Sequence, residues 1–115
     1  MKEVAELDVY RLAEALSDMI WNDFDRWPEK AQRTIGYQVI RAADSIAANI
    51  AEGYGRGSRA DYARFVAMSR GSAAEVESQL LLARRLAFAS PLELDALLER
   101  VTNVRCLLSG LLRSL

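Results

Sequence analysis

The sequence contains no histidine, one cysteine and two prolines among its 115 residues. The absence of histidine removes the most common general base. It also leaves any zinc site dependent on carboxylates, because the only thiol is Cys106. A single cysteine excludes a disulfide within the chain. We therefore expect neither a histidine-dependent enzyme nor a disulfide-stabilised domain, and we expect no cofactor and no small-molecule substrate.

Long hydrophobic runs are also missing. No stretch approaches the roughly 20 consecutive apolar residues that a membrane-spanning helix needs, and the charged start MKEVAELDVY is unlike a signal peptide. We therefore expect a cytoplasmic protein with no membrane partner. Apolar residues still make up 51% of the chain. A chain of this length fits a single domain, residues 1–115, that buries roughly two thirds of its unfolded surface.

The net charge of −1 conceals an uneven distribution. Residues 1–29 carry three basic and eight acidic side chains, a net of −5, whereas residues 30–115 carry twelve and eight, a net of +4. All basic residues except Lys2 and Lys30 are arginines, whose planar guanidinium groups suit bidentate pairing with carboxylates or phosphates. A net charge near zero argues against a general coat of nucleic acid but permits a local basic face.

Hydrophobic periodicity predicts four helices, at about residues 5–26, 29–52, 58–88 and 91–114. Trp27-Pro28 separates the first two, and Gly53 is expected to end the second. Ser58 and Ser90 are expected to cap the third and fourth. Because the connections are short and no strand pattern occurs, the sequence predicts an all-α, antiparallel up-down four-helix bundle.

The third and fourth predicted helices carry apolar residues on more than one face. Seven aliphatic residues of the fourth helix alternate spacings of three and four, while Leu107 points elsewhere. These faces exceed what a lone bundle buries, so we expect assembly with further copies. Gly71, in the third helix among serines and alanines, predicts a close approach of another helix. The stripe of the fourth helix is Leu94, Leu97, Val101, Val104, Leu108, Leu111 and Leu115.

Residues 41–59, RAADSIAANIAEGYGRGSR, end in a glycine-rich, basic loop that leads into a helix. Backbone N–H groups and the dipole at a helix N-terminus attract anions, and nearby Tyr54, Tyr62 and Phe65 could stack on bases. No strand precedes the loop and it lacks the lysine of a nucleotide-binding loop, so hydrolysis of nucleotides is not indicated. The same residues also suit a simple capped turn, with Tyr62 and Phe65 in the core. The candidate phosphate contacts are Arg41, Arg56, Arg59 and Arg64.

Asn49 is a polar residue beside the apolar positions of the second predicted helix. An amide buried without partners costs roughly 1–3 kcal/mol, so we expect it to be hydrogen-bonded. We interpret it as part of a structural polar network that fixes helix register, with a ligand-binding role as the alternative. The expected members of this network are Ser45, Asn49, Glu52 and Glu75, with Gln79 as a further possible partner of Asn49.

The stretch RAADSIAANIAEGYGRGSRADYARFVAMSRGSAAEVESQL resembles the core of a known family of four-helix-bundle proteins. These proteins are encoded in intervening sequences of bacterial 23S ribosomal RNA genes, and the resemblance covers nearly the whole chain. It implies a homopentameric ring with no established enzymatic activity. The chain is also similar to the accessory proteins of diversity-generating retroelements, a resemblance that implies basic pentameric barrels that bind nucleic acid and a reverse transcriptase.

Two functional hypotheses follow. In the first, a non-enzymatic, ring-forming bundle contacts the backbone of RNA or DNA through the four arginines named above. In the second, the assembly has a structural or protein-interaction role, and these arginines pair with Glu52, Asp61 or a neighbouring subunit. An enzymatic role is not supported, because no nucleophile–base pair or metal cluster can be assembled from the sequence.

Overall fold

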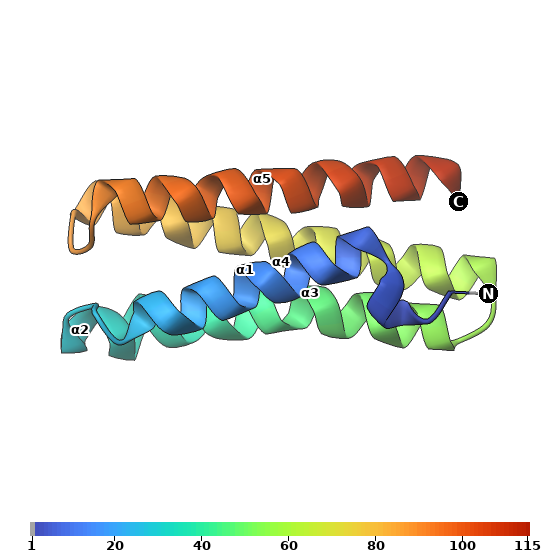
Figure 1. Cartoon of the computed structure of the whole chain (residues 1–115), viewed down its shortest axis with the longest axis horizontal. Helices are drawn as coiled ribbons and strands as arrows, with labels where there is room; N and C mark the ends of the chain where they lie inside the picture. Colours follow the sequence, from blue (N-terminus) through green and yellow to red (C-terminus); the bar gives the residue numbers. More distant parts are fainter. Residues whose placement is uncertain (1) are drawn as a thin grey trace.

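The computed structural model describes residues 2–115, which form four long helices along a body of 43 × 20 × 20 Å (Figure 1). A 3-10 turn, Val4–Glu6, precedes α1, Asp8–Phe24. The second helix starts as α2, Glu29–Ala31, passes through a π-helical turn, Gln32–Gly36, and continues as α3, Tyr37–Gly55. It is followed by α4, Arg59–Leu86, and α5, Pro91–Ser114. The predicted all-α fold with four helices is confirmed, and residues 2–115 contain no strand.

Successive long helices are joined at alternate ends of the body (Figure 1). The connections from α1 to α2 and from α4 to α5 lie at one end, whereas the α3–α4 connection lies at the other end near both chain termini. Around the body, α3 packs against α1 and α4, and α5 packs against α4 and α1. The basic loop predicted from the sequence therefore lies at one end of the elongated bundle. No helix within residues 2–115 has the length and apolar character that crossing a membrane requires.

The core follows the apolar stripes that the sequence predicts. In α5 the first five of the seven stripe residues are buried, and Leu111 and Leu115 pack against the core while remaining half-buried. Burying each large aliphatic side chain contributes roughly 1.5–3 kcal/mol. At the α4–α5 end, the buried Trp27 meets the ring of Phe88 edge-on at 5.6 Å. The buried residues of α1 are Val9, Ala13, Leu16 and Ile20.

Two predictions about glycine are wrong. The second helix does not end at Gly53 but continues to Gly55, and it is Gly57, at φ 81°, that takes the left-handed backbone. Gly53 is instead a close-packing position, because a Cβ there would lie 2.6 Å from the Cβ of Phe65 on α4. Gly71, expected in close packing, is exposed, and an added Cβ would meet nothing within 4 Å.

The π-helical turn has no clear signal in the sequence. It places Gly36 against the ring of Phe24, where an added Cβ would lie 2.6 Å from a ring carbon. The Gln32 side chain donates from Nε2 to the carbonyl of Phe24 at 2.8 Å. This bond joins the end of α1 to the start of the second helix, so the irregular turn is held by both a side-chain hydrogen bond and close packing.

Candidate nucleic-acid interface

The α3–α4 connection, residues 56–58, is a tight turn rather than an extended loop. The backbone N–H of Arg56 donates to the carbonyl of Gly53 at 3.2 Å, which closes the last turn of α3. Gly57 then reverses the chain, and Ser58 begins α4 by accepting a hydrogen bond at Oγ from the backbone N–H of Asp61 at 3.0 Å. The serine cap predicted from the sequence is present, and such a cap contributes about 1 kcal/mol.

Phe65 organises the arginines at this end of the bundle. Its buried ring faces Gly53, and two guanidinium groups lie against it. The Cζ atom of Arg56 is 5.0 Å from the ring centroid, and that of Arg64 is 4.6 Å from it. Cation–π contacts at such distances contribute about 0.5–1 kcal/mol where the cation is exposed. The contact explains how an arginine of the α3–α4 turn and an arginine of α4 come to lie against the same ring.

Arg56 and Arg64 also have acidic partners. Arg56 pairs with Glu52 at 2.9 Å, and Arg64 approaches Asp61 at 3.5 Å. The side chains of the two arginines remain 45% and 57% exposed, so each ion pair contributes at most about 1 kcal/mol. Both pairings are those that the structural hypothesis expects, yet pairs this weak can be exchanged for other anions.

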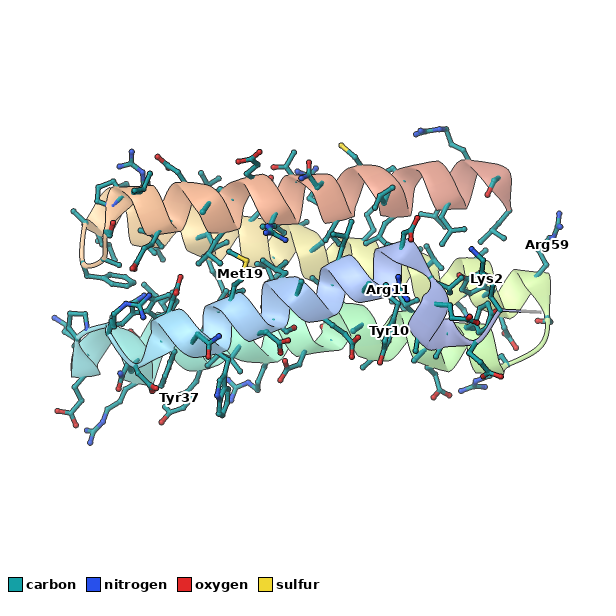
Figure 2. The ribbon with its side chains drawn as sticks, in the orientation of Figure 1. Lys2, Tyr10, Arg11, Met19, Tyr37 and Arg59 are labelled. Atoms are coloured by element: carbon teal, nitrogen blue, oxygen red, sulfur yellow. The ribbon has the colours of Figure 1, made fainter. Side chains whose placement is uncertain are left out.

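Arg59 differs from its two neighbours. It is the first residue of α4, is exposed, and has no ion pair within the part of the chain that the structure describes. In Figure 2 its side chain extends away from the ribbon at the α3–α4 end. Arg41 is also exposed and without an ion pair in residues 2–115. However, it lies 15 residues before Arg56, about 22 Å along the helix. The structure therefore gathers Arg56, Arg59 and Arg64 at one end and leaves Arg41 apart.

A pocket of about 360 Å³ opens beside Arg59 at the same end. The rings of Tyr54 and Tyr62 meet edge to face at 5.6 Å, and the Tyr54 hydroxyl donates to the carbonyl of Lys2. Burial raises the pKa of the Tyr62 phenol above its usual value, and Tyr54 adds to the rise. The pocket is lined by Gly53, Tyr54, Gly57, Ser58, Arg59, Tyr62 and Leu115.

The predicted polar network is divided in the structure. Asn49 donates from Nδ2 to the backbone carbonyl of Ser45 at 2.8 Å, a bond within one helix, and it is only half-buried. Glu52 pairs with Arg56, and Glu75 approaches Gln79 at 3.5 Å. The interpretation of Asn49 as a link that fixes register between helices is therefore corrected, because its side chain lies on the flank of α3 and bonds back along its own helix.

Serines make the polar links between α3 and α4 that the sequence analysis assigned to Asn49. Ser69 is fully buried and donates from Oγ to the backbone carbonyl of Ile46 at 2.8 Å. The Oγ atoms of Ser45 and Ser72 lie 2.6 Å apart. The signal was present in the sequence, since Ser69 occupies an otherwise apolar heptad stripe of α4.

Ion pairs link α5 to α4 at two positions along its length. Arg105 donates from Nη1 to both carboxylate oxygens of Glu77, at 2.8 and 2.7 Å, and Arg84 pairs with Asp95 at 2.9 Å. Both ion pairs join residues of different helices, so the spacing of charged residues along the sequence could not predict them. Within residues 2–115, no group of three or more histidine, cysteine, aspartate or glutamate side chains could hold a metal ion.

Comparison with known proteins gives two findings. A crystal structure at 1.70 Å, of a protein with unknown function from the S23 ribosomal protein family of Bacteroides thetaiotaomicron, superposes with a TM-score of 0.82. It is 22% identical and covers 90% of this chain and 97% of its own, which shows a shared fold. No curated protein sequence matches the chain. The family model for the 23S rRNA-intervening sequence protein matches residues 5–110. Because that match spans most of the sequence, the chain belongs to the 23S rRNA-intervening sequence protein family.

Proposed function

We propose that this protein is a non-enzymatic, homo-oligomeric bundle that contacts the phosphate backbone of RNA or DNA with the α3–α4 end of each subunit. The observation that carries the proposal is the placement of Arg59. This cation occupies the first position of α4, is exposed, and has no acidic partner within the described residues. The main contacts are Arg56, Arg59 and Arg64, three cations gathered at one end of the bundle.

Helix stability does not account for an arginine at this position. The N-terminus of a helix carries the positive end of its dipole, and a cation there is unfavourable by about 0.3–1 kcal/mol. Asp61, two residues later in the same first turn, is the type of residue that stabilises such an end. Since Arg59 neither packs in the core nor pairs with a carboxylate of residues 2–115, a contact with an external anion is the role that fits it.

Arg56 and Arg64 are pre-positioned by Phe65 and can exchange partners. Their carboxylates Glu52 and Asp61 are exposed, so a phosphate that displaces either carboxylate forfeits a pair worth at most about 1 kcal/mol. Arg41, about 22 Å away along α3, joins the interface only where the nucleic acid also follows that helix. Its contribution should therefore depend on the length of the ligand.

Exposed apolar side chains support the assembly part of the proposal. Seven large ones are 40–81% exposed and occur on all four long helices. We propose that the antiparallel up-down bundle buries them against further copies in a ring of five subunits, on the basis of the family resemblance. A ring would repeat the arginine cluster in each subunit, so weak single contacts would combine into higher overall affinity. The exposed side chains are Trp21, Tyr37, Met68, Leu81, Leu86, Leu92 and Leu107.

The test compares Arg59→Ala with the wild type in filter binding to structured RNA and duplex DNA at low salt. Wild-type binding should weaken as salt rises, with a log–log slope near 0.9 per duplex phosphate contacted. Arg59→Ala should bind more weakly with a smaller slope, while its helix content and oligomeric state stay unchanged. The matched control is Arg100→Ala on α5, an exposed arginine likewise unpaired in residues 2–115. No retention of either nucleic acid at micromolar wild-type protein would refute the nucleic-acid proposal.

The second candidate function is a structural assembly without nucleic acid. The pairs Arg56–Glu52 and Arg64–Asp61 favour it, because they give two of the three clustered arginines a role inside the subunit. Light scattering on Arg56→Ala and Arg59→Ala separates the two functions. Loss of the oligomer would favour the structural assembly, whereas an intact oligomer with lost binding would favour the nucleic-acid interface.

A further inference from the structure

The pocket beside Arg59 adds a feature that phosphate contact alone does not require. It is concave, about 360 Å³ in volume, and flanked by two tyrosine rings and the aliphatic side chain of Leu115. We propose that this pocket binds one unpaired nucleotide, with the base against Tyr54 and Tyr62 and the phosphate on Arg59. This inference rests on the proposed nucleic-acid function and assigns a ligand class to the same end of the bundle.

The size and composition of the pocket suit this occupant. Ligand pockets commonly measure about 300–1,000 Å³ and combine mostly apolar walls with a few polar groups. Here Tyr54 and Tyr62 provide the aromatic wall, and Arg59 is the cationic residue of the lining. A flat aromatic base can stack on the tyrosine rings, and an anionic phosphate can pair with Arg59. A single nucleotide therefore complements both parts of the pocket.

The tyrosines are held before any ligand arrives. The Tyr54 hydroxyl donates to the Lys2 carbonyl, and its ring packs edge to face with that of Tyr62. No hydrogen bond joins the Tyr62 hydroxyl to another of the described residues, so this group can still donate to a base edge. A tyrosine phenol is protonated at neutral pH, and burial raises the pKa of this one further above its usual value.

The same geometry predicts a preference for single strands. In a duplex, bases are stacked and paired, and their faces cannot reach a pocket in the protein surface. An unpaired base in a loop or at an end can stack on an aromatic side chain, and loss of one such contact typically lowers affinity by about tenfold or more. Duplexes should therefore gain only the phosphate contacts of the arginines, whereas single strands gain the stacking contact as well.

The experiment uses the full-length protein and a single-stranded RNA of about 12 nucleotides that carries 2-aminopurine. The blunt duplex of the same sequence is the comparison ligand. Wild-type protein should bind the single strand about tenfold more tightly and should change the 2-aminopurine fluorescence, which reports stacking of that base. Tyr54→Leu should abolish the fluorescence change and the preference for single strands, while duplex binding is retained.

Two further variants serve as controls for the Tyr54→Leu result. Arg100→Ala alters an exposed arginine of α5 that has no ion pair in residues 2–115 and should leave both signals unchanged. Leu115→Glu places a carboxylate in the pocket lining and leaves both tyrosines unchanged in sequence. It should weaken single-strand binding, and it keeps the proposal testable if the Tyr54→Leu variant does not fold. Equal affinity for both ligands, or an unchanged fluorescence response in Tyr54→Leu and Leu115→Glu, would overturn the pocket assignment and leave the proposed function intact. Absence of binding to either ligand would refute both.

Discussion

Gly53 offers the sharpest test of how α3 and α4 are held together. Replacing it by alanine adds one methyl group, whose carbon would lie 2.6 Å from the Cβ of Phe65 and 3.3 Å from a ring carbon of Tyr62. The Phe65 Cβ is attached to the backbone of α4 and cannot move aside alone, so the two helices must separate. Overpacking of this kind costs about 1–3 kcal/mol, and the rigid neighbour places Gly53→Ala toward the upper end, about 2–3 kcal/mol.

An opposing gain must be subtracted from this cost. Alanine is a better helix former than glycine by roughly 0.5–1 kcal/mol, and Gly53 lies within α3. The net destabilisation expected for Gly53→Ala is therefore about 1–2.5 kcal/mol. Gly71→Ala makes the same chemical change on the exposed face of α4, where an added Cβ meets nothing within 4 Å. It should stabilise the protein by about 0.5–1 kcal/mol. Because the propensity gain is common to both, the difference between the variants isolates the steric cost.

The assay is urea unfolding followed by far-UV circular dichroism, at one protein concentration because assembly makes stability depend on concentration. Gly53→Ala should lower the midpoint and Gly71→Ala should raise it, with unchanged slopes. Gly55→Ala, at the end of the same helix and also in open space, controls for position along α3. The reasoning would be refuted if Gly53→Ala were as stable as the other two variants.

Three further predictions concern single contacts, each measured by denaturant unfolding. Ala87→Gly should stabilise the protein by about 0.5–1 kcal/mol, because Ala87 ends α4 at φ 56°, where glycine has no steric penalty; an unchanged midpoint would contradict this. Ser69→Ala should cost about 1 kcal/mol, since it removes the buried hydrogen bond to the Ile46 carbonyl; a neutral result would show that the bond does not hold α3 to α4. Tyr62 has a raised pKa in the fold, so above about pH 10 the unfolded state loses its proton first and stability falls as pH rises. Tyr62→Phe should therefore lose less stability than the wild type between about pH 9 and about pH 11, and an equal loss would exclude this phenol as its source.

The sequence predicted the helices well because a heptad stripe depends only on local spacing. Leu94, Leu97 and Val101 are buried as expected, and Ser58 and Ser90 cap their helices as expected. A cap requires only a side chain and a backbone N–H three residues later, so it is visible in a short segment. These features need no knowledge of which helix lies next to which.

Apart from the end of the second helix, the failures depended on how each helix is rotated toward its neighbours. Gly53 and Gly71 are both helical glycines, but one faces α4 closely and the other faces outward. Asn49 is one residue from a buried isoleucine, yet a turn of about 100° per residue places it on the flank of α3. Ser69 falls at an apolar spacing of α4, but its bond to Ile46 depends on the relative height of α3 and α4. The spacing of apolar residues identifies which face of a helix is buried, but it does not identify which atoms of the neighbouring helix contact that face.

The candidate site shows the same division between local and tertiary information. The sequence grouped Arg41, Arg56, Arg59 and Arg64 by composition, and tertiary structure separates them by role. Arg56 and Arg64 stabilise the bundle through Phe65 and their carboxylates, so replacing either should affect both stability and binding.

Arg59 opposes the dipole of α4 and has no partner among the described residues, so its replacement should affect binding while leaving stability equal or slightly higher. Under the proposed function, this exposed cation beside an aromatic pocket serves to bind an anionic ligand. The ratio of binding loss to stability change, measured at all four arginines, should therefore be largest at Arg59. If the ratio is instead uniform across the four, these arginines are surface cations of the bundle and not an interface.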